Sequence, residues 1–241
     1  MKRNAYIILS SLLICLGAGC ASSGKTLLLT QRETIALVSI VANDDINWKG
    51  EESIDPNTTI FFTNRNLRND PDKTIISKTD ALMESAEMLI RETLAGSVIN
   101  LAERRSVLQS KAYLEAQLNK YQINRKQNKP KDFRFIDHRD KNFFSALAAE
   151  TGIQRTMFVD FNLTKSMKSG VGKFGSCQAE VEAVFIILDV QGKTIIRKKI
   201  ELGSLSVIDV SGGVYSHSEL MSVFESTIID ACYEFLDYLE K

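Results

Sequence analysis

The chain has 241 residues, of which 44% are hydrophobic and 25% are charged, and 30 Lys and Arg balance 30 Asp and Glu. This composition excludes a disordered chain, because apolar residues are too frequent and the net charge is too low. A balanced charge also leaves no overall field to attract nucleic acid, so we expect no nucleic-acid partner. With two His and four Cys in the whole chain, we expect no metal and no cofactor.

The first 19 residues follow the order of a secretory signal peptide. Lys2 and Arg3 precede an apolar run from Ala5 to Leu16, and small residues come next. A membrane-spanning helix needs roughly 20 apolar residues, and the small and polar residues of GAGCASSGK interrupt the run before that length. We therefore expect residues 1–19 to be removed on export.

The segment LGAGC, which ends at Cys20, resembles the lipobox of bacterial lipoproteins. In those proteins a small residue precedes a Cys that receives diacylglycerol and becomes the mature N-terminus. The resemblance implies that Cys20 carries acyl chains such as palmitate. Gly17 departs from the pattern, because Leu is usual there, and Cys15 is the poorer candidate because the bulky Ile14 precedes it. A plain cleaved signal peptide and an uncleaved N-terminal anchor are the alternatives.

A lipidated Cys20 would hold the rest of the chain on a membrane, because each buried acyl methylene contributes about 0.8 kcal/mol. Residues 20–32 would then form a short tether, and residues 33–241 a folded domain. Ala21 follows the Cys, and by resemblance to lipoprotein sorting this favours the outer membrane, with the domain facing the periplasm.

The apolar run 35–42 predicts a buried strand. The segment 43–77 is polar and rich in turn residues, which predicts a long loop with one short strand, TTIFFT, at 58–63. Trp48, the only Trp, lies in this loop. It is either a contact residue or, as we expect, a residue that packs onto its own loop.

Helical periodicity begins after Thr79, which we expect to cap a helix that ends at Gly96. A short strand is predicted at 98–101, and a second, partly amphipathic helix at 103–121. The segment 119–132, here called the basic connector, has almost no apolar residues.

The basic connector carries five cations, which are Lys120, Arg125, Lys126, Lys129 and Lys131. They could contact lipid phosphates, a glycan or an acidic partner. A solvated linker explains the same residues, and this is the interpretation that we favour.

The second half of the domain begins with a helix at 143–151, which Asp140 caps and Gly152 ends. A strand at 155–167 and a glycine-rich turn at 168–176 follow.

The runs 177–190 and 193–202 flank Gln191-Gly192 and predict a β-hairpin. In its first strand small and apolar residues alternate with glutamates, which indicates a half-exposed strand. Ser216 and Glu219 form a capping box before a C-terminal helix.

Helices alternate with strands at first and a meander follows. We therefore predict a single domain of the α/β (α+β) class, with a mixed β-sheet flanked by helices. Cys177 falls in a predicted strand and Cys232 in a predicted helix. They could form a disulfide in an oxidising compartment, but two buried small apolar residues are the more common outcome.

Few residues indicate chemistry. Asp137, His138 and Asp140 could begin a metal site, but no distant fourth ligand is evident, and a helix cap with exposed charges explains them better. Ser216, beside His217, is better explained by capping than as a nucleophile.

The glycine-rich segment SGVGKFG lacks the spacing of a phosphate-binding loop and favours a hairpin turn. We expect no enzymatic activity.

The order of these elements resembles the periplasmic domain of curli-secretion CsgG-type lipoproteins, and is similar to the LpoB-type activators of penicillin-binding proteins. The resemblance rests on Glu103-Arg104 with Leu108, on the segment LAAETGIQRTMFVDF, and on Asp189-Val190 before a Gly turn. Gly152-Ile153 and Gln191 depart from the family pattern.

The resemblance implies a membrane-anchored envelope lipoprotein that binds another envelope protein, as an assembly factor or regulator. An oligomeric export component of the CsgG type, and thus a homo-oligomer, is the first alternative. No long alternating segments that would build a membrane pore are evident, and the segment 168–176 is too short to hold a pair of strands of about 9–11 residues each, which counts against it. A metal-dependent enzyme is the second alternative.

Overall fold

The structure of the protein is a computed structural model that describes residues 34–49, 70–95, 99–171 and 174–240. The signal peptide, Cys20, the tether and the predicted strand at 58–63 lie outside the described residues, so they stay predictions. Both boundaries of the predicted domain also fall outside the described ranges.

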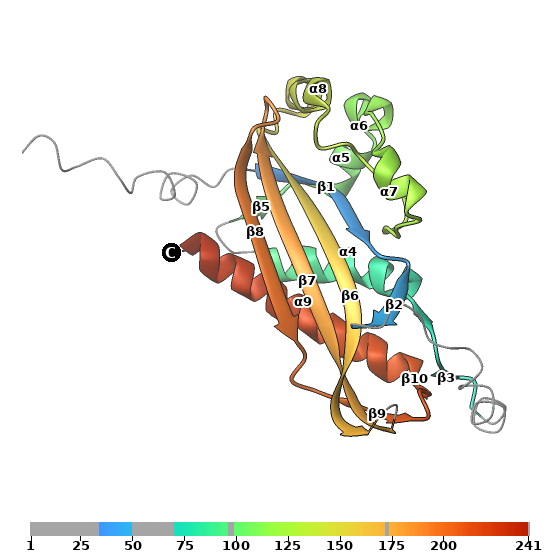
Figure 1. Ribbon diagram of the computed structural model, residues 1–241. Helices are drawn as coiled ribbons and strands as arrows, with labels where there is room; N and C mark the ends of the chain where they lie inside the picture. The colour runs from blue at the N-terminus through green and yellow to red at the C-terminus, as the bar shows by residue number, and fades with distance from the viewer. Residues whose placement is uncertain (1–33, 50–69, 96–98, 172–173, 241) are drawn as a thin grey trace, which may run out of the picture.

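A mixed sheet of eight strands forms the centre of the described chain (Figure 1). Its strands are β1 (Thr34–Ala42), β2 (Asp45–Trp48), β4 (Ser77–Lys78), β5 (Asn100–Leu101), β6 (Arg155–Val171), β7 (Phe174–Asp189), β8 (Thr194–Gly203) and β9 (Ile208–Ser211). β6 and β7 form a long antiparallel hairpin, in register from Arg155 opposite Asp189 to Val171 opposite Phe174. A separate two-stranded sheet joins β3 (Lys73–Thr74) to β10 (Tyr215–Ser216).

The two sides of this hairpin differ in strand direction. On the free edge of β6, β1 and then β2 run parallel to it. β5 extends the sheet in parallel beyond β1, and β4 pairs antiparallel with β2. On the free edge of β7, β8 and β9 are both antiparallel. The mixed sheet predicted from the sequence is therefore confirmed.

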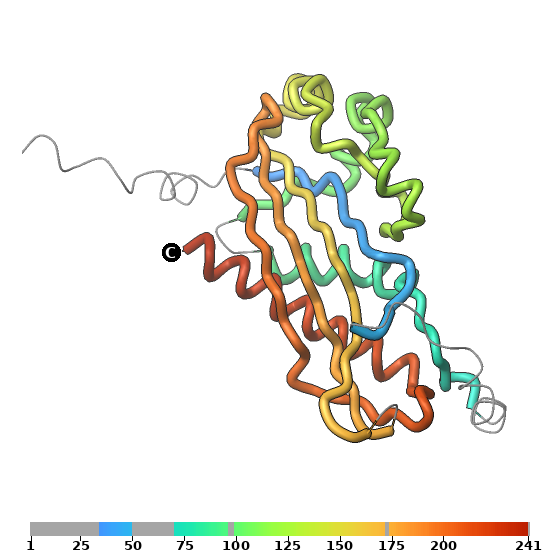
Figure 2. Tube along the Cα trace, in the orientation of Figure 1, coloured from blue at the N-terminus to red at the C-terminus, as the bar shows by residue number. Residues whose placement is uncertain are grey.

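The described helices divide into two groups (Figures 1 and 2). They are α4 (Asp80–Leu94), α5 (Arg104–Leu108), α6 (Lys111–Glu115), α7 (Lys120–Asn124), α8 (Lys141–Thr151) and α9 (His217–Glu240). α4 and α9 pack on each other and on one face of the sheet, against β1, β7 and β8. The shorter helices α5 to α8 gather at one end of the sheet.

Alternation along β7 builds the core between sheet and helices. Val181, Ala183 and Phe185 are buried, and the Phe185 ring stacks on Phe235 of α9 with centroids 4.3 Å apart. Glu180 and Glu182 alternate with them and point to the other face. The predicted half-exposed strand is thus confirmed, and burying its apolar residues stabilises the contact with α9.

Local signals placed several boundaries correctly. The strand predicted at 35–42 is β1, and α4 begins at Asp80. The Asp140 carboxylate accepts a hydrogen bond from the Phe143 amide at the start of α8. Gly152 ends α8 in the left-handed conformation, φ 73°, which glycine adopts without steric cost. These boundaries depend on backbone chemistry close in sequence, which is why the sequence predicts them.

The helix predicted at 103–121 is wrong. Two five-residue helices, α5 and α6, stand there, and α7 is separate. The chain breaks at Ser110, whose backbone is extended and whose hydroxyl accepts a hydrogen bond from the Tyr113 amide. A side chain that satisfies the first free amides of a new helix competes with continuation of the old one.

Two further predictions need correction. Thr79 precedes α4, but its hydroxyl donates to the Asn43 carbonyl at 2.7 Å and makes no capping bond. The turn predicted at 168–176 is mostly strand, because β6 continues to Val171 and β7 begins at Phe174. The Thr79 hydroxyl is engaged by a carbonyl between β1 and β2, and the start of β7 also pairs with β9, so tertiary contacts override the local propensities.

The segment predicted as a loop at 43–77 contains β2, β3 and β4 within its described parts. Of the two hydrogen bonds that define the C-terminal capping box, the structure has the one in which the Glu219 amide donates to the Ser216 hydroxyl, at 3.2 Å. The strand predicted at 98–101 is the short β5.

Cys177 and Cys232 are both buried and both free, so the disulfide that the sequence left open is not formed. Burial raises the pKa of Cys177 to about 11 and that of Cys232 to about 12. Their role is that of small apolar core residues, on β7 and α9.

Candidate functional site

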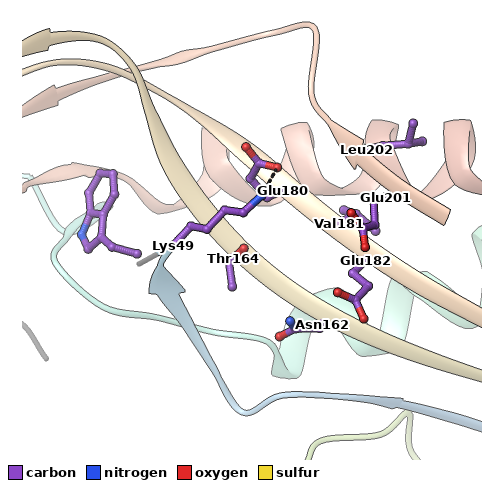
Figure 3. Close-up of a pocket in the computed structure, with 9 residues that line it drawn as sticks. Lys49, Asn162, Thr164, Glu180, Val181, Glu182, Glu201 and Leu202 are labelled. Carbon is purple, nitrogen blue, oxygen red and sulfur yellow. Dashed lines mark hydrogen bonds and ion pairs between the residues drawn. The ribbon is translucent and has the colours of Figure 1, made fainter. Parts of the chain in front are cut away.

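The face of the sheet opposite α4 and α9 carries polar side chains from β2, β6, β7 and β8, and we call it the open face (Figure 3). A hollow of about 360 Å³ lies on it. Its lining consists of Trp48, Lys49, Asn162, Thr164, Glu180, Val181, Glu182, Glu201 and Leu202. No described helix covers this hollow, and the side chains of Glu182 and Glu201 keep 37% and 65% of their surface exposed.

Glu180 is the most firmly held group of the open face. It accepts hydrogen bonds from Ser166 at 2.6 Å and from Gln178 at 2.7 Å, and Lys49 lies 3.3 Å away (Figure 3). Burial acts to raise the pKa of Glu180, but these three donors outweigh it and the pKa lies below its ordinary value. The carboxylate therefore remains ionised at neutral pH.

Beside Glu180, the paired strands β7 and β8 carry a second cluster of charged side chains. Glu182 stands directly opposite Glu201, and the Lys199 ammonium bridges the two carboxylates, 3.1 Å from Glu182. The hydrogen bond from Lys199 lowers the pKa of Glu201. Like charges directly opposite on a sheet repel. The Lys199 ammonium, which pairs with both carboxylates, offsets the repulsion between Glu182 and Glu201.

Two histidine-containing motifs were singled out in the sequence. In the first, Asp140 uses one oxygen to cap α8 and the other to accept from the Gln117 amide at 2.9 Å. Asp137 accepts from the Arg139 amide, and the His138 ring packs against Phe158. Among the described residues, no group of three or more His, Cys, Asp or Glu is placed to hold a metal ion. The capping interpretation is the one that these contacts favour.

In the second motif, His217 Nδ1 lies 2.9 Å from the Ser77 hydroxyl, a contact that the sequence analysis missed. Ser77 also contacts the Tyr215 hydroxyl at 3.2 Å. A Ser–His pair is the arrangement of an activated nucleophile, but Ser77 is 1% exposed. No substrate could reach it, so we assign the pair a structural role. Because 140 residues separate the partners, no local pattern marks the contact.

The same region ties the start of α9 to the chain before β3. The Asp72 carboxylate accepts from the Ser218 amide at 2.9 Å and from the hydroxyls of Ser216 and Ser218. These bonds, led by the one from Ser216, lower the pKa of Asp72. An anion at a helix N-terminus is stabilised by the free amides and the helix dipole.

Trp48, which we expected to pack onto its own loop, contacts Tyr215 and Lys165, two residues outside that loop. It is buried at the edge of the hollow, and its ring meets Tyr215 of β10 edge-on at 6.5 Å. The ammonium of the buried Lys165 lies 5.0 Å from both rings and donates to the Ile46 carbonyl. Contact between cation and rings lowers the cost of burying this charge.

The glycine-rich hairpin and Arg104 also have structural explanations. Gly170 and Gly175 face each other across β6 and β7 with positive φ angles, and a Cβ on Gly170 would come within 2.0 Å of the Phe174 carbonyl oxygen. Arg104 pairs with Glu87 of α4 at 2.9 Å and donates to the Lys131 carbonyl.

The basic connector lies on the surface and includes α7. Lys120, Arg125, Lys126 and Lys131 are exposed, and Lys129 is half-buried beside Phe135. Its only acidic residue, Asp132, pairs with Arg104 at 3.4 Å. The predicted solvated linker is therefore partly ordered, with one helical turn fixed on the surface.

Comparison with known proteins gives a limited result. No protein-family model matches the chain, and no curated protein matches it. Among solved structures, the chain is similar to the LpoB C-terminal domain from Salmonella enterica, with 11% sequence identity and a TM-score of 0.25. That likeness covers 70% of this chain and 84% of the LpoB domain.

Within residues 34–49, 70–95, 99–171 and 174–240, no helix is both long enough and apolar enough to cross a membrane.

Proposed function

We propose that the chain is a non-enzymatic envelope lipoprotein, anchored in the outer membrane through Cys20, that binds another envelope protein on its open face. It would act there as an assembly factor or as a regulator. The LGAGC segment supports the anchor. The open face supports the binding, and it is the observation that carries the proposal.

The charge of the open face supports one kind of occupant. Glu180, Glu182 and Glu201 lie in one hollow, and two ammonium groups, Lys49 and Lys199, offset them only in part. An excess of carboxylates on a preformed surface complements a protein segment that presents Arg or Lys. We therefore propose a basic segment of the partner as the occupant.

The protonation of these groups favours binding over catalysis. General acid–base catalysis works best when the pKa of the group lies near the working pH. The pKa values of Glu180 and Glu201 are lowered, so both groups are poor proton carriers at neutral pH. Fixed charges of this kind serve to recognise and orient a partner.

The anchor is tested by feeding cells an alkyne-bearing fatty acid and measuring its incorporation into the protein. We expect Cys20→Ser to abolish labelling and Cys15→Ser to leave it unchanged, which makes Cys15 the matched control. Labelling that persists in Cys20→Ser would show that the anchor is assigned to the wrong residue.

The binding face is tested by photo-crosslinking in intact cells, with a photoreactive amino acid at position 182 on the open face or at position 230 on α9. Both positions are exposed on ordered elements. We expect position 182 to crosslink to one envelope protein and position 230 not to. Adding Glu201→Lys should reduce the yield from position 182. Equal capture from both positions would count against the open face.

The same experiment separates the oligomeric export alternative. Crosslinks between copies of this chain, together with rings in electron micrographs of detergent extracts, would favour a CsgG-type assembly. A strict monomer would remove that alternative and leave the binding proposal in place.

A further inference from the structure

The basic connector concentrates positive charge in a chain whose net charge is zero. It carries five cations and one carboxylate, and that carboxylate is already paired with Arg104. None of Lys120, Arg125 and Lys126 has an ion-pair partner among the described residues. The connector is therefore a surface of uncompensated charge.

Exposed apolar side chains lie among these cations. Leu118, Tyr121 and Ile123 are 41%, 58% and 41% exposed, and Leu114 at the end of α6 is also exposed. No residue of α7 is buried, so its apolar side chains contribute nothing to the core. The Arg125 guanidinium lies 4.4 Å from the centre of the Tyr121 ring. A cation and an amphipathic aromatic ring are thereby presented together.

The chain holds this surface in place from both ends. Helices of five residues are not stable alone. The Asn119 side chain accepts from the amides of Tyr121 and Gln122 at 3.1 and 3.3 Å. Beyond α7, the backbones of Ala42 and Asn128 exchange two hydrogen bonds, at 2.9 and 2.8 Å. α7 is therefore a fixed projection on the surface.

The opposite charge collects on another element. α9 has 24 residues, with six Asp or Glu and no Lys or Arg, and it lies away from α7 (Figure 1). Its carboxylates are exposed or half-buried along the side that faces away from the sheet. Near a negatively charged plane the connector would be attracted and α9 repelled, which gives the domain a preferred orientation.

From these observations we propose that the surface formed by Leu114, Leu118 and α7 rests on an anionic lipid bilayer. Its cations would contact lipid phosphates, and its exposed tyrosine and aliphatic side chains would lie at the headgroup level. Basic residues beside exposed aromatic and aliphatic ones characterise segments that lie in a membrane interface. The proposal concerns a second membrane contact and is independent of the lipid on Cys20. An acidic protein partner is the competing occupant, and exchange measured on neutral and on anionic vesicles distinguishes it from a lipid bilayer.

The test uses the full chain reconstituted on vesicles, with hydrogen exchange followed by mass spectrometry. Neutral vesicles contain phosphatidylcholine only, and anionic vesicles contain phosphatidylcholine and phosphatidylglycerol. We expect amides of residues 119–126 to exchange severalfold more slowly on anionic vesicles, and the effect to disappear at high salt because the contact is screened. Amides of α9 should exchange equally on both.

Two double variants with the same change of net charge make the matched pair. Arg125→Glu/Lys126→Glu should abolish the slowing, and Lys168→Glu/Lys193→Glu, which changes exposed lysines elsewhere, should retain it. Neither should shift the thermal midpoint, since α7 buries no residue and both control lysines are exposed.

Equal exchange of residues 119–126 on neutral and anionic vesicles, or slowing that survives Arg125→Glu/Lys126→Glu, would overturn the proposal and favour a protein occupant. Slowing caused by inorganic phosphate alone on neutral vesicles would overturn it as well. Failure of the chain to float with neutral vesicles would instead count against the anchor at Cys20, so the two proposals fail by different results.

Discussion

The two faces of β7 have opposite roles although their residues alternate along one strand. Val181, Ala183 and Phe185 are buried, and Phe185 stacks on Phe235 of α9, whereas Glu180 and Glu182 lie on the open face in contact with cations. Apolar packing holds the buried residues in place, whereas hydrogen bonds and ion pairs hold the two glutamates. We therefore expect substitutions on one face to leave the other face intact.

The largest expected contrast between the faces is in chemical access. Cys177 on the covered face should react with iodoacetamide at least roughly 10³-fold more slowly than a cysteine introduced by Glu182→Cys. Reaction of a core thiol requires opening of the sheet, which costs a free energy close to that of unfolding. Peptide mass spectrometry during labelling measures both rates in one sample, with Cys232 as a second buried reference. Similar rates would contradict the assignment of the faces.

Truncation of the covered face should cost the most stability. Phe185→Ala removes a ring that is fully buried and stacked on Phe235, and it should lower the free energy of unfolding by about 3–5 kcal/mol. Glu182→Ala, three residues away on the open face, is the control. Urea unfolding followed by circular dichroism measures both, and equal losses would show that the open face is also part of the core.

An intermediate loss is expected from the buried cation of the covered face. Lys165→Met keeps most of the side-chain volume but removes the donor to the Ile46 carbonyl and the charge beside Trp48 and Tyr215. A carbonyl that loses a buried donor costs about 1–3 kcal/mol. Chemical denaturation gives the number, and a more stable Lys165→Met would mean that desolvation of the ammonium outweighs its contacts.

A pH-dependent loss is expected at the start of α9. The pKa of Asp72 is lowered below its ordinary value of 3.8 by bonds from Ser216 and Ser218, so its contribution to stability is present above that value. It is lost as pH falls through the lowered pKa of the folded state. Asp72→Asn should therefore lower the thermal midpoint at pH 7.

The gap between wild type and Asp72→Asn should narrow as the pH falls below about 4. Thermal unfolding at a series of pH values checks this, with Asp70→Asn as a neighbouring control. A gap that stays constant at all pH values would show that the carboxylate charge is not what stabilises the start of α9.

The smallest effect on stability should come from the open face itself. Lys199→Gln removes the cation between Glu182 and Glu201, but all three side chains are exposed to solvent. Exposed ion pairs contribute little to stability, so the thermal midpoint should change by no more than the error of its measurement. The crosslinking yield at position 182 should change clearly, and a variant that unfolds without altering the crosslink would reverse the roles of the faces.

Local chemistry explains which predictions succeeded. The buried strand at 35–42, the cap at Asp140 and the left-handed Gly152 depend on residues within a few positions of each other. Breaks such as the one at Ser110 depend on competition between a capping hydroxyl and helix continuation. A helical period in the sequence does not reveal whether the helix continues or a capping hydroxyl starts a new one. One long helix was therefore predicted where the structure has the two short helices α5 and α6.

Periodicity and composition are properties of short stretches, so the class of the fold, the alternation of β7 and the basic connector could all be predicted from the sequence. The LGAGC segment, on which the anchor proposal rests, is likewise read directly from the sequence. Three features became evident only in the folded chain: Ser77 contacts His217, the Lys165 ammonium lies near the rings of Trp48 and Tyr215, and no described helix covers the open face. The residues that meet in these contacts lie far apart in sequence, 140 positions in the case of Ser77 and His217, and such pairs are chosen by the packing of the whole sheet.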